Sequence, residues 1–129
     1  MVINLKCLID YKITSSEGKI VEKDIKAIYH DNQLTFKDEH YSIKLIINTD
    51  NIIMIKEDLS SKTTLDFILN KKTNSEYLIK DVNILLDLKV LTHKLEISKE
   101  RILIEYEVWF DDEYSGKFNY EIDIKDKNI

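Results

Sequence analysis

The sequence has few of the residues on which many recognisable functional sites depend. Its 129 residues include no proline, one cysteine and two glycines, Gly18 and Gly116. Two isolated glycines exclude a glycine-rich phosphate loop, a dinucleotide-binding fingerprint and a Gly-x-Ser-x-Gly nucleophile elbow, because each motif needs glycines at closely spaced positions. None of the three histidines has a second histidine or cysteine at metal-ligand spacing. The sequence therefore predicts no metal site and no cofactor.

The single cysteine, Cys7, excludes an internal disulfide and fits a reducing compartment, so we expect a cytoplasmic protein. Cys7 shares its alternation with Ile3, Leu5 and Ile9, which is typical of a small core residue rather than of a nucleophile. The first residues lack the basic segment and apolar run of a signal peptide. No stretch approaches the roughly 20 apolar residues of a membrane-spanning helix, so we expect no membrane span.

Charge of one sign is not concentrated anywhere in the sequence. The 24 acidic and 19 basic residues give a net charge of −5 and are scattered among the apolar residues. A surface that follows phosphates needs a basic cluster, so we expect no nucleic-acid partner. No serine, histidine or carboxylate pairing stands out, which favours a protein without catalytic activity. A hydrolase with paired carboxylates stays open as an alternative.

The sequence does contain a clear alternation of apolar and polar residues. It is strongest in the stretch 81–110, DVNILLDLKVLTHKLEISKERILIEYEVWF, which predicts a long β-hairpin with arms at 84–97 and 102–110. In the first arm the alternating apolar residues have even residue numbers up to Val90 and odd residue numbers from Leu91 onwards. This slip of one residue predicts a β-bulge between Val90 and His93, a device that bends long strands around a closed sheet.

The same alternation recurs along the chain. It predicts about ten strands, at 3–13, 19–30, 34–36, 41–47, 52–56, 63–69, 76–80, 84–97, 102–110 and 118–124. Val21 and Leu69 fall on the inward faces of their strands, whereas the four apolar residues at 52–55 leave the inward face of that strand undecided. A sandwich and a barrel both fit this count. Because the strands follow one another in hairpins, we predict one all-β domain over residues 1–129, an antiparallel barrel of about 8–10 strands.

Several segments resemble the YwiB-like family of small bacterial proteins, a family of unknown function. They are LDLKVLTHKLEI with Thr92, RILIEYEVWF with Tyr106, and the preceding IIMIKEDL and LDFIL. The resemblance spans about Leu5 to Ile124 and implies a calycin-like, or lipocalin-like, β-barrel without implying an activity. The chain departs from the family at 57–58, where it has Glu-Asp in place of an Arg-Gly pair, so a ligand role for that arginine does not carry over.

Tyrosines on the apolar faces of the predicted strands are the candidate site residues. Tyr11, Tyr29, Tyr106 and Tyr120 have this position, and a buried phenol needs a hydrogen-bond partner. They are either amphipathic core residues or the lining of a pocket. We predict that Tyr29, Tyr106 and Tyr120 lie near one barrel end and bind a small, mostly apolar ligand there. The alternative is a packed barrel that acts as a protein-interaction or structural module.

Two large apolar residues lie on the opposite, outward face of the predicted strand 102–110. Leu103 and Trp109 share that face with Glu105 and Glu107. An exposed tryptophan is a frequent anchor of protein interfaces, so these residues suggest an interface and a homodimer. The alternative is that a neighbouring loop covers them.

Overall fold

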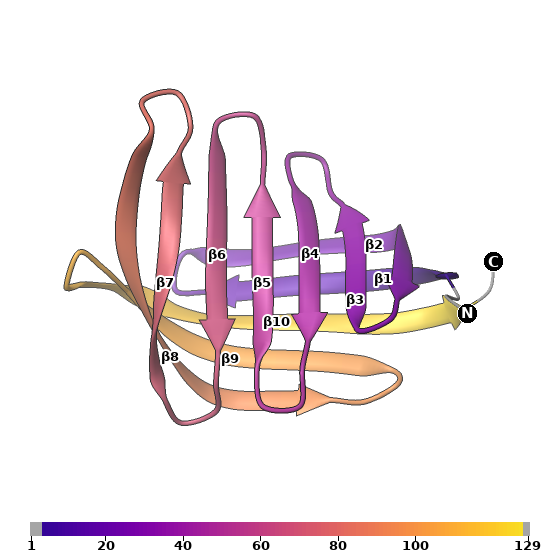
Figure 1. Ribbon diagram of the computed structural model, residues 1–129. Helices are drawn as coiled ribbons and strands as arrows, with labels where there is room; N and C mark the ends of the chain where they lie inside the picture. Colours follow the sequence, from indigo (N-terminus) through magenta and orange to yellow (C-terminus); the bar gives the residue numbers. More distant parts are fainter. Residues whose placement is uncertain (1–3, 128–129) are drawn as a thin grey trace.

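The structure, a computed structural model that describes residues 4–127, is a closed barrel of ten antiparallel strands (Figure 1). In chain order they are β1 (Asn4–Ser15), β2 (Gly18–His30), β3 (Gln33–Lys37), β4 (Ser42–Ile47), β5 (Ile52–Glu57), β6 (Ser61–Phe67), β7 (Lys72–Ile79), β8 (Ile84–Ile97), β9 (Arg101–Phe110) and β10 (Glu113–Lys127). Each strand pairs with its neighbours in sequence, and β1 pairs with β10 to close the barrel. The predicted all-β barrel is confirmed.

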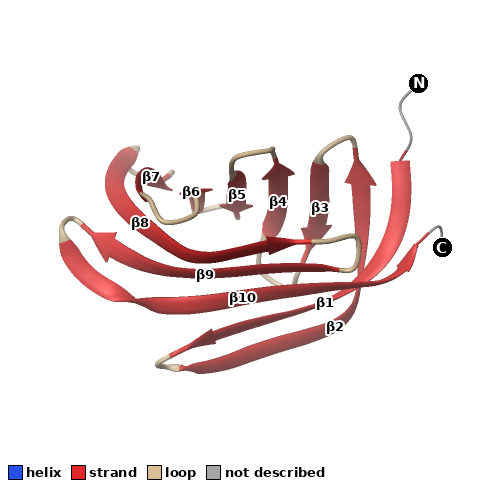
Figure 2. Ribbon diagram, turned by 90° about the horizontal axis from the view of Figure 1, so that it is seen from below, coloured by secondary structure: helices blue, strands red, loops and turns tan. Residues whose placement is uncertain are grey.

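The two walls of the barrel run crosswise. In Figure 2, β8, β9, β10, β1 and β2 extend along one wall, while β3 to β6 stand across them on the other side. This arrangement lets the inner faces of both walls share one core. Within residues 4–127 there is no helix long and apolar enough to cross a membrane.

The meander collects the connecting turns at two ends of the barrel. We call one end the Lys56 end; its turns are 16–17, 38–41, 58–60, 80–83 and 111–112. We call the other the Tyr29 end; its turns are 31–32, 48–51, 68–71 and 98–100. Lys56 lies just before the turn 58–60, and Tyr29 lies just before the turn 31–32, so the two residues mark opposite ends.

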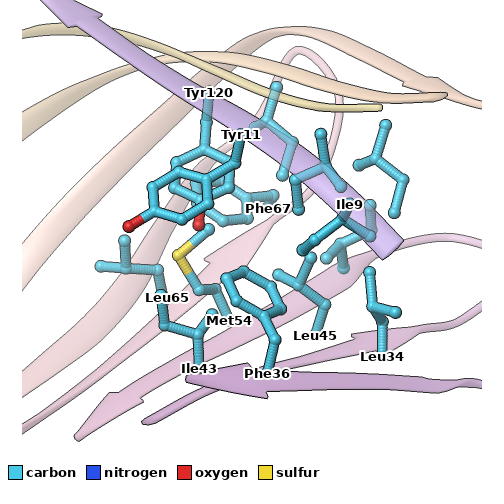
Figure 3. Close-up of a cluster of buried hydrophobic side chains, with 14 of the residues drawn as sticks. Ile9, Tyr11, Leu34, Phe36, Ile43, Leu45, Met54, Leu65, Phe67 and Tyr120 are labelled. Atoms are coloured by element: carbon cyan, nitrogen blue, oxygen red, sulfur yellow. The ribbon is translucent and has the colours of Figure 1, made fainter. Parts of the chain in front are cut away.

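A packed layer fills the middle of the barrel between these ends (Figure 3). Its fully buried side chains include Ile9, Leu34, Leu45, Ile52, Phe67, Val90, Ile104 and Ile122. They come from eight different strands and lie on the inward positions of the alternation. The barrel is therefore filled over its middle, and two hollows lie towards its ends.

The long strand β8 carries the bulge that the sequence predicts. Its register against β9 shifts between Thr92 and Lys94, so that His93 is the extra residue. Val90 and Thr92 are both fully buried, which means that the inward face changes after Thr92. Leu91, which the sequence pattern assigns to the inward set, therefore faces outward.

Two other inward assignments are wrong for local reasons. Val21 is exposed because β2 has a bulge opposite Asp10, where Asp24 takes a positive φ of 59°; Glu22 therefore pairs with Tyr11 on the inward face. Leu69 is exposed because β6 already ends at Phe67 and Leu69 lies in the turn 68–71. The predicted strand 76–80 in fact begins earlier, since β7 starts at Lys72.

Candidate functional site

The structure does not bring the three predicted tyrosines together. Tyr106 and Tyr120 line a cavity at the Lys56 end, whereas Tyr29 lines a separate pocket at the Tyr29 end. The expectation that all three share one end therefore does not hold. The reason is their distance from the turns: Tyr29 is the penultimate residue of β2, while Tyr106 and Tyr120 lie well inside β9 and β10.

The cavity at the Lys56 end has a volume of about 240 Å³ and mostly apolar walls. It is lined by Ile13, Met54, Lys56, Thr63, Leu65, Leu88, Tyr106, Val108, Ser115, Phe118 and Tyr120. Its volume is smaller than the roughly 300–1,000 Å³ of a pocket for a drug-sized molecule, so the cavity suits a small ligand.

Lys56 is the one charged residue in that lining. It follows Ile52 and Met54 at intervals of two along β5, and both of these are buried, so its side chain starts from the inward face. The Lys56 Nζ lies 4.3 Å from the centroid of the Tyr41 ring, a cation–π contact. Burial lowers the pKa of the Lys56 ammonium, and the negative charges of Asp38 and Asp58 oppose that shift only in part.

The hydroxyl of Tyr120 is buried without a partner. Tyr120 is 2% exposed, and its oxygen makes no hydrogen bond with any residue that the structure describes. Its ring stacks on that of Tyr11, with the centroids 6.1 Å apart and the planes 5° from parallel (Figure 3). Burial raises the pKa of both Tyr120 and Tyr106, so both stay neutral phenols that can donate a hydrogen bond.

Asp38 holds the turn between β3 and β4 beside this cavity. Its Oδ2 accepts a hydrogen bond from the Tyr11 hydroxyl at 2.7 Å, and its Oδ1 accepts the backbone N–H groups of His40 and Tyr41 at 2.8 and 2.6 Å. Burial alone would raise the pKa of Asp38, but these hydrogen bonds outweigh it and lower the pKa. Burial and the neighbouring Asp38 raise the pKa of Tyr11. The contact ties β1 to the turn that carries Tyr41.

The pocket at the Tyr29 end is larger and more uniformly apolar. Its volume is about 600 Å³, and it is lined by Cys7, Tyr29, Ile47, Ile97, Ser98, Lys99, Ile102 and Ile124. Cys7 is 2% exposed and belongs to the core, as the sequence predicts. Ser98 shapes one side of the pocket, because its Oγ accepts the backbone N–H groups of Glu100 and Arg101 in the turn 98–100.

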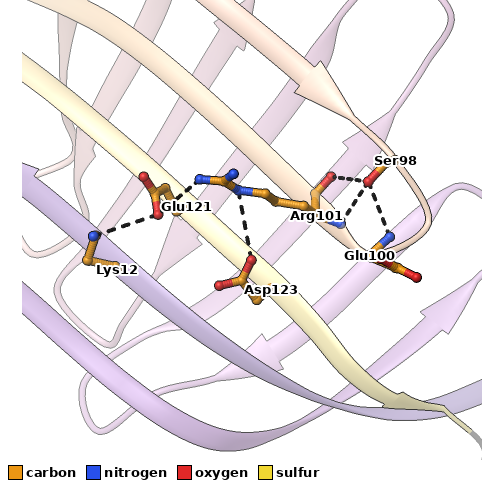
Figure 4. Close-up of polar contacts among 6 residues, drawn as sticks. All are labelled: Lys12, Ser98, Glu100, Arg101, Glu121 and Asp123. Atoms are coloured by element: carbon orange, nitrogen blue, oxygen red, sulfur yellow. Dashed lines mark hydrogen bonds and ion pairs between the residues drawn. The ribbon is translucent and has the colours of Figure 1, made fainter.

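An ion-pair network on the outer surface braces the strands that follow this turn (Figure 4). The Arg101 guanidinium lies 3.4 Å from Glu121 and 3.9 Å from Asp123, and Lys12 lies 3.8 Å from Glu121. These contacts connect β9, β10 and β1. Because the residues are solvent-accessible, we assign them a small stabilising effect rather than a role in binding.

The predicted outer-surface residues differ from each other in exposure. Leu103 is 7% exposed and lies between Glu96 of β8 and Glu121 of β10, so it presents no exposed apolar anchor. Trp109 is half-buried, with the Lys72 Nζ 4.0 Å from its ring centroid and the Tyr114 ring edge-on at 5.5 Å. The structure thus covers Leu103 but leaves part of Trp109 accessible.

Histidine and carboxylate side chains meet on the outer surface without forming a metal site. At the β8 bulge the His93 Nε2 lies 2.5 Å from Glu107 Oε1. Over residues 4–127, no group of three histidine, cysteine, aspartate or glutamate side chains is placed to hold a metal ion.

Ten antiparallel strands in a closed meander, filled in the middle and hollow towards both ends, define a small β-barrel of the YwiB type. The chain belongs to the family described as "Domain of unknown function (DUF1934)", whose profile matches residues 10–122. The ywiB protein from Bacillus subtilis has a similar crystal structure, with a TM-score of 0.57 and 11% identity over 97% of this chain and 94% of that chain. This likeness concerns the fold alone. No curated protein matches the sequence.

Lys56 and Asp38, two residues of the cavity region, were not predicted from the sequence. The signal for Lys56 was present, because it shares parity with Ile52 and Met54. It was hidden by Ile53 and Ile55, which make both faces of β5 apolar. Asp38 gave the sequence signal of a turn, but its contact with Tyr11 joins residues 27 positions apart and had no local signal.

Proposed function

We propose that this protein binds a small, mostly apolar molecule in the cavity at the Lys56 end. The observation that carries the proposal is Tyr120, a residue of the apolar cavity lining whose buried hydroxyl lacks a hydrogen-bond partner among the described residues. Leaving a buried hydroxyl unpaired costs roughly 1–3 kcal/mol, and a ligand with an acceptor atom would recover that energy.

The shape of the interior supports the same proposal. Barrels of about eight strands have room for their own side chains or for one small ligand, and the ten strands here leave space beyond the packed middle layer. Apolar walls with a few convergent polar groups are typical of ligand pockets. Here the walls include Met54, Leu65 and Val108, and the polar residues are Lys56, Thr63, Ser115, Tyr106 and Tyr120.

Thermal unfolding with a panel of small molecules tests the proposal. The panel contains benzyl alcohol, 1-hexanol, benzamide, hexanamide, benzoate and hexanoate, all small enough for the cavity. A compound at a hundredfold excess over its dissociation constant should add about 2.7 kcal/mol to the free energy of unfolding. If no compound raises the unfolding temperature, the proposal is wrong.

Two variants of β6 locate the binding site. Thr63 lines the cavity, whereas its neighbour Thr64 lies on the opposite face of the same strand. Thr63→Trp should occupy the cavity and abolish the stabilisation by ligand, and Thr64→Trp should leave it unchanged. Circular dichroism of both variants checks that the barrel is retained. Equal loss in both variants would place binding elsewhere.

The second candidate is a packed barrel that acts through its outer surface as an interaction module or homodimer. The observation in its favour is a cluster of exposed apolar residues at the β7–β8 turn and the start of β8, namely Val82, Ile84 and Leu85. Sedimentation velocity at high micromolar concentration distinguishes the two candidates. A monomer whose sedimentation is unchanged by Leu85→Ser or Trp109→Ala would exclude the homodimer.

A further inference from the structure

Lys56 has no direct anionic partner, although two carboxylates lie near it. Among the residues that the structure describes, no carboxylate forms an ion pair with its ammonium. Asp38 and Asp58 act on it only through their longer-range charge. Lys56 is half-buried, and removing an ammonium even partly from water without a counter-charge is costly. One cation–π contact with Tyr41 offsets that cost only in part.

Both carboxylates are already engaged by their own turns. Asp38 accepts the Tyr11 hydroxyl and two backbone N–H groups. Asp58 accepts the backbone N–H groups of Ser60 and Ser61 at 2.8 and 2.7 Å and the Ser61 hydroxyl at 3.1 Å. Moving either carboxylate to Lys56 would break a turn. The lysine is thus left free to take its anion from elsewhere.

The second group that needs an acceptor is the buried hydroxyl of Tyr120, a residue of the cavity lining. The ammonium of Lys56 can only donate hydrogen bonds, and the Tyr120 hydroxyl has no acceptor in the described structure. Two residues of one mostly apolar lining, Lys56 and Tyr120, therefore each carry a donor that lacks an acceptor. A carboxylate has two acceptor oxygens and no donor, so it matches this pair better than an amide or an alcohol does.

We infer that the ligand of this cavity is a small monocarboxylic acid, whose carboxylate is bound by Lys56 and Tyr120 and whose apolar part fills the remaining space. The inference rests on the proposed function and narrows it to one ligand class. The single ammonium in the lining selects one negative charge. Asp38 and the inward-facing Glu22 disfavour a second, because both lie close enough to affect the ionisation of Tyr120.

Isothermal titration with acid–amide pairs of equal shape tests this inference. Benzoate is compared with benzamide, and hexanoate with hexanamide, first in the unmodified protein. A charge-assisted hydrogen bond in place of a neutral one should make the preferred acid bind at least about tenfold more tightly than its amide. This comparison needs no variant and so does not depend on whether a substituted chain folds.

Two lysine variants then assign the preference to one side chain. Lys56→Met keeps the length of the side chain and should abolish the preference for the acid. Lys44→Met removes the same charge from the exposed, outward face of the neighbouring strand β4 and should retain the preference. Tyr120→Phe should weaken binding of both members of a pair, since the hydroxyl donates to either.

The outcomes separate the two proposals. If amides bind as tightly as their acids, or if Lys56→Met keeps the preference, the carboxylate inference is wrong while small-molecule binding stands. If neither acids nor amides bind, the carboxylate inference is overturned, and if benzyl alcohol and 1-hexanol also fail to bind, the proposed function is overturned with it.

Discussion

The pockets at the two ends of the barrel differ in volume and, more importantly, in the polar groups of their linings. The Tyr29 end has the larger pocket, about 600 Å³ against about 240 Å³, yet its described lining contains no buried polar atom without a hydrogen bond. The Lys56 end combines an inward-facing ammonium with a buried, unpaired phenol. Unsatisfied polar groups are costly and need a reason, whereas an apolar hollow at a barrel mouth needs none. The smaller cavity is therefore the stronger candidate site.

The turns at the two ends show a related difference. Asp38, Asp58 and Ser98 each begin a turn in which the side-chain oxygen accepts the backbone N–H groups two and three residues later. This device fixes a tight turn without glycine or proline. Of the three, Asp38 also accepts a hydroxyl from a distant strand, that of Tyr11. The same turn motif thus occurs at both ends, and at Asp38, at the Lys56 end, it is also hydrogen-bonded to the buried Tyr11.

The largest expected effect comes from breaking the packed layer that separates the two ends. Phe67 is fully buried and its ring centroid lies 4.7 Å from that of Tyr106. Phe67→Ala should lower the free energy of unfolding by about 3–5 kcal/mol, because it removes buried apolar surface and leaves a cavity. Phe110→Ala, at an exposed position, is the control and should cost much less. Urea denaturation measures both, and equal losses would contradict the layer described above.

The next largest loss of stability should come from removing the hydrogen bond between Tyr11 and Asp38, which links β1 to a turn at the Lys56 end. Tyr11→Phe should cost about 1–2 kcal/mol, since a hydrogen bond to a charged acceptor contributes roughly 1.5–3 kcal/mol when shielded and less near solvent. The two single variants, Tyr11→Phe and Asp38→Asn, and the double variant form a thermodynamic cycle. Additive losses would show that the hydroxyl and the carboxylate do not stabilise each other.

A smaller effect should appear in the pH dependence of stability. The pKa of Asp38 in the folded protein lies below the roughly 3.9 of an unfolded aspartate. Its stabilising contribution is therefore present above about pH 4 and is lost as the pH falls through the folded-state pKa. Urea denaturation between about pH 7 and pH 2 should show a steeper loss for the unmodified protein than for Asp38→Asn. Parallel profiles would contradict the lowered pKa.

Alternation was sufficient to predict the strands and the β8 bulge from the sequence, because both follow from the period of two. The closed meander was predicted from the succession of hairpins. It was not sufficient where the pattern is locally ambiguous or interrupted. The apolar run 52–55 hid the inward direction of Lys56, and the bulge at Asp24 exchanged Val21 for Glu22 on the inner face. The distance of Tyr29 from its turn was readable in the sequence, but the cavities depend on packing between distant strands.

The smallest expected effect is at the Tyr29 end, and it sharpens the comparison between the ends. Tyr29 is half-buried and lines the apolar pocket, so Tyr29→Phe should change the free energy of unfolding by no more than about 0.5 kcal/mol. Because the packed middle layer separates it from Lys56, it should also leave benzoate and hexanoate binding unchanged. Isothermal titration of Tyr29→Phe beside Tyr120→Phe measures this. If both variants weaken binding equally, the two ends do not act independently and the distinction between them fails.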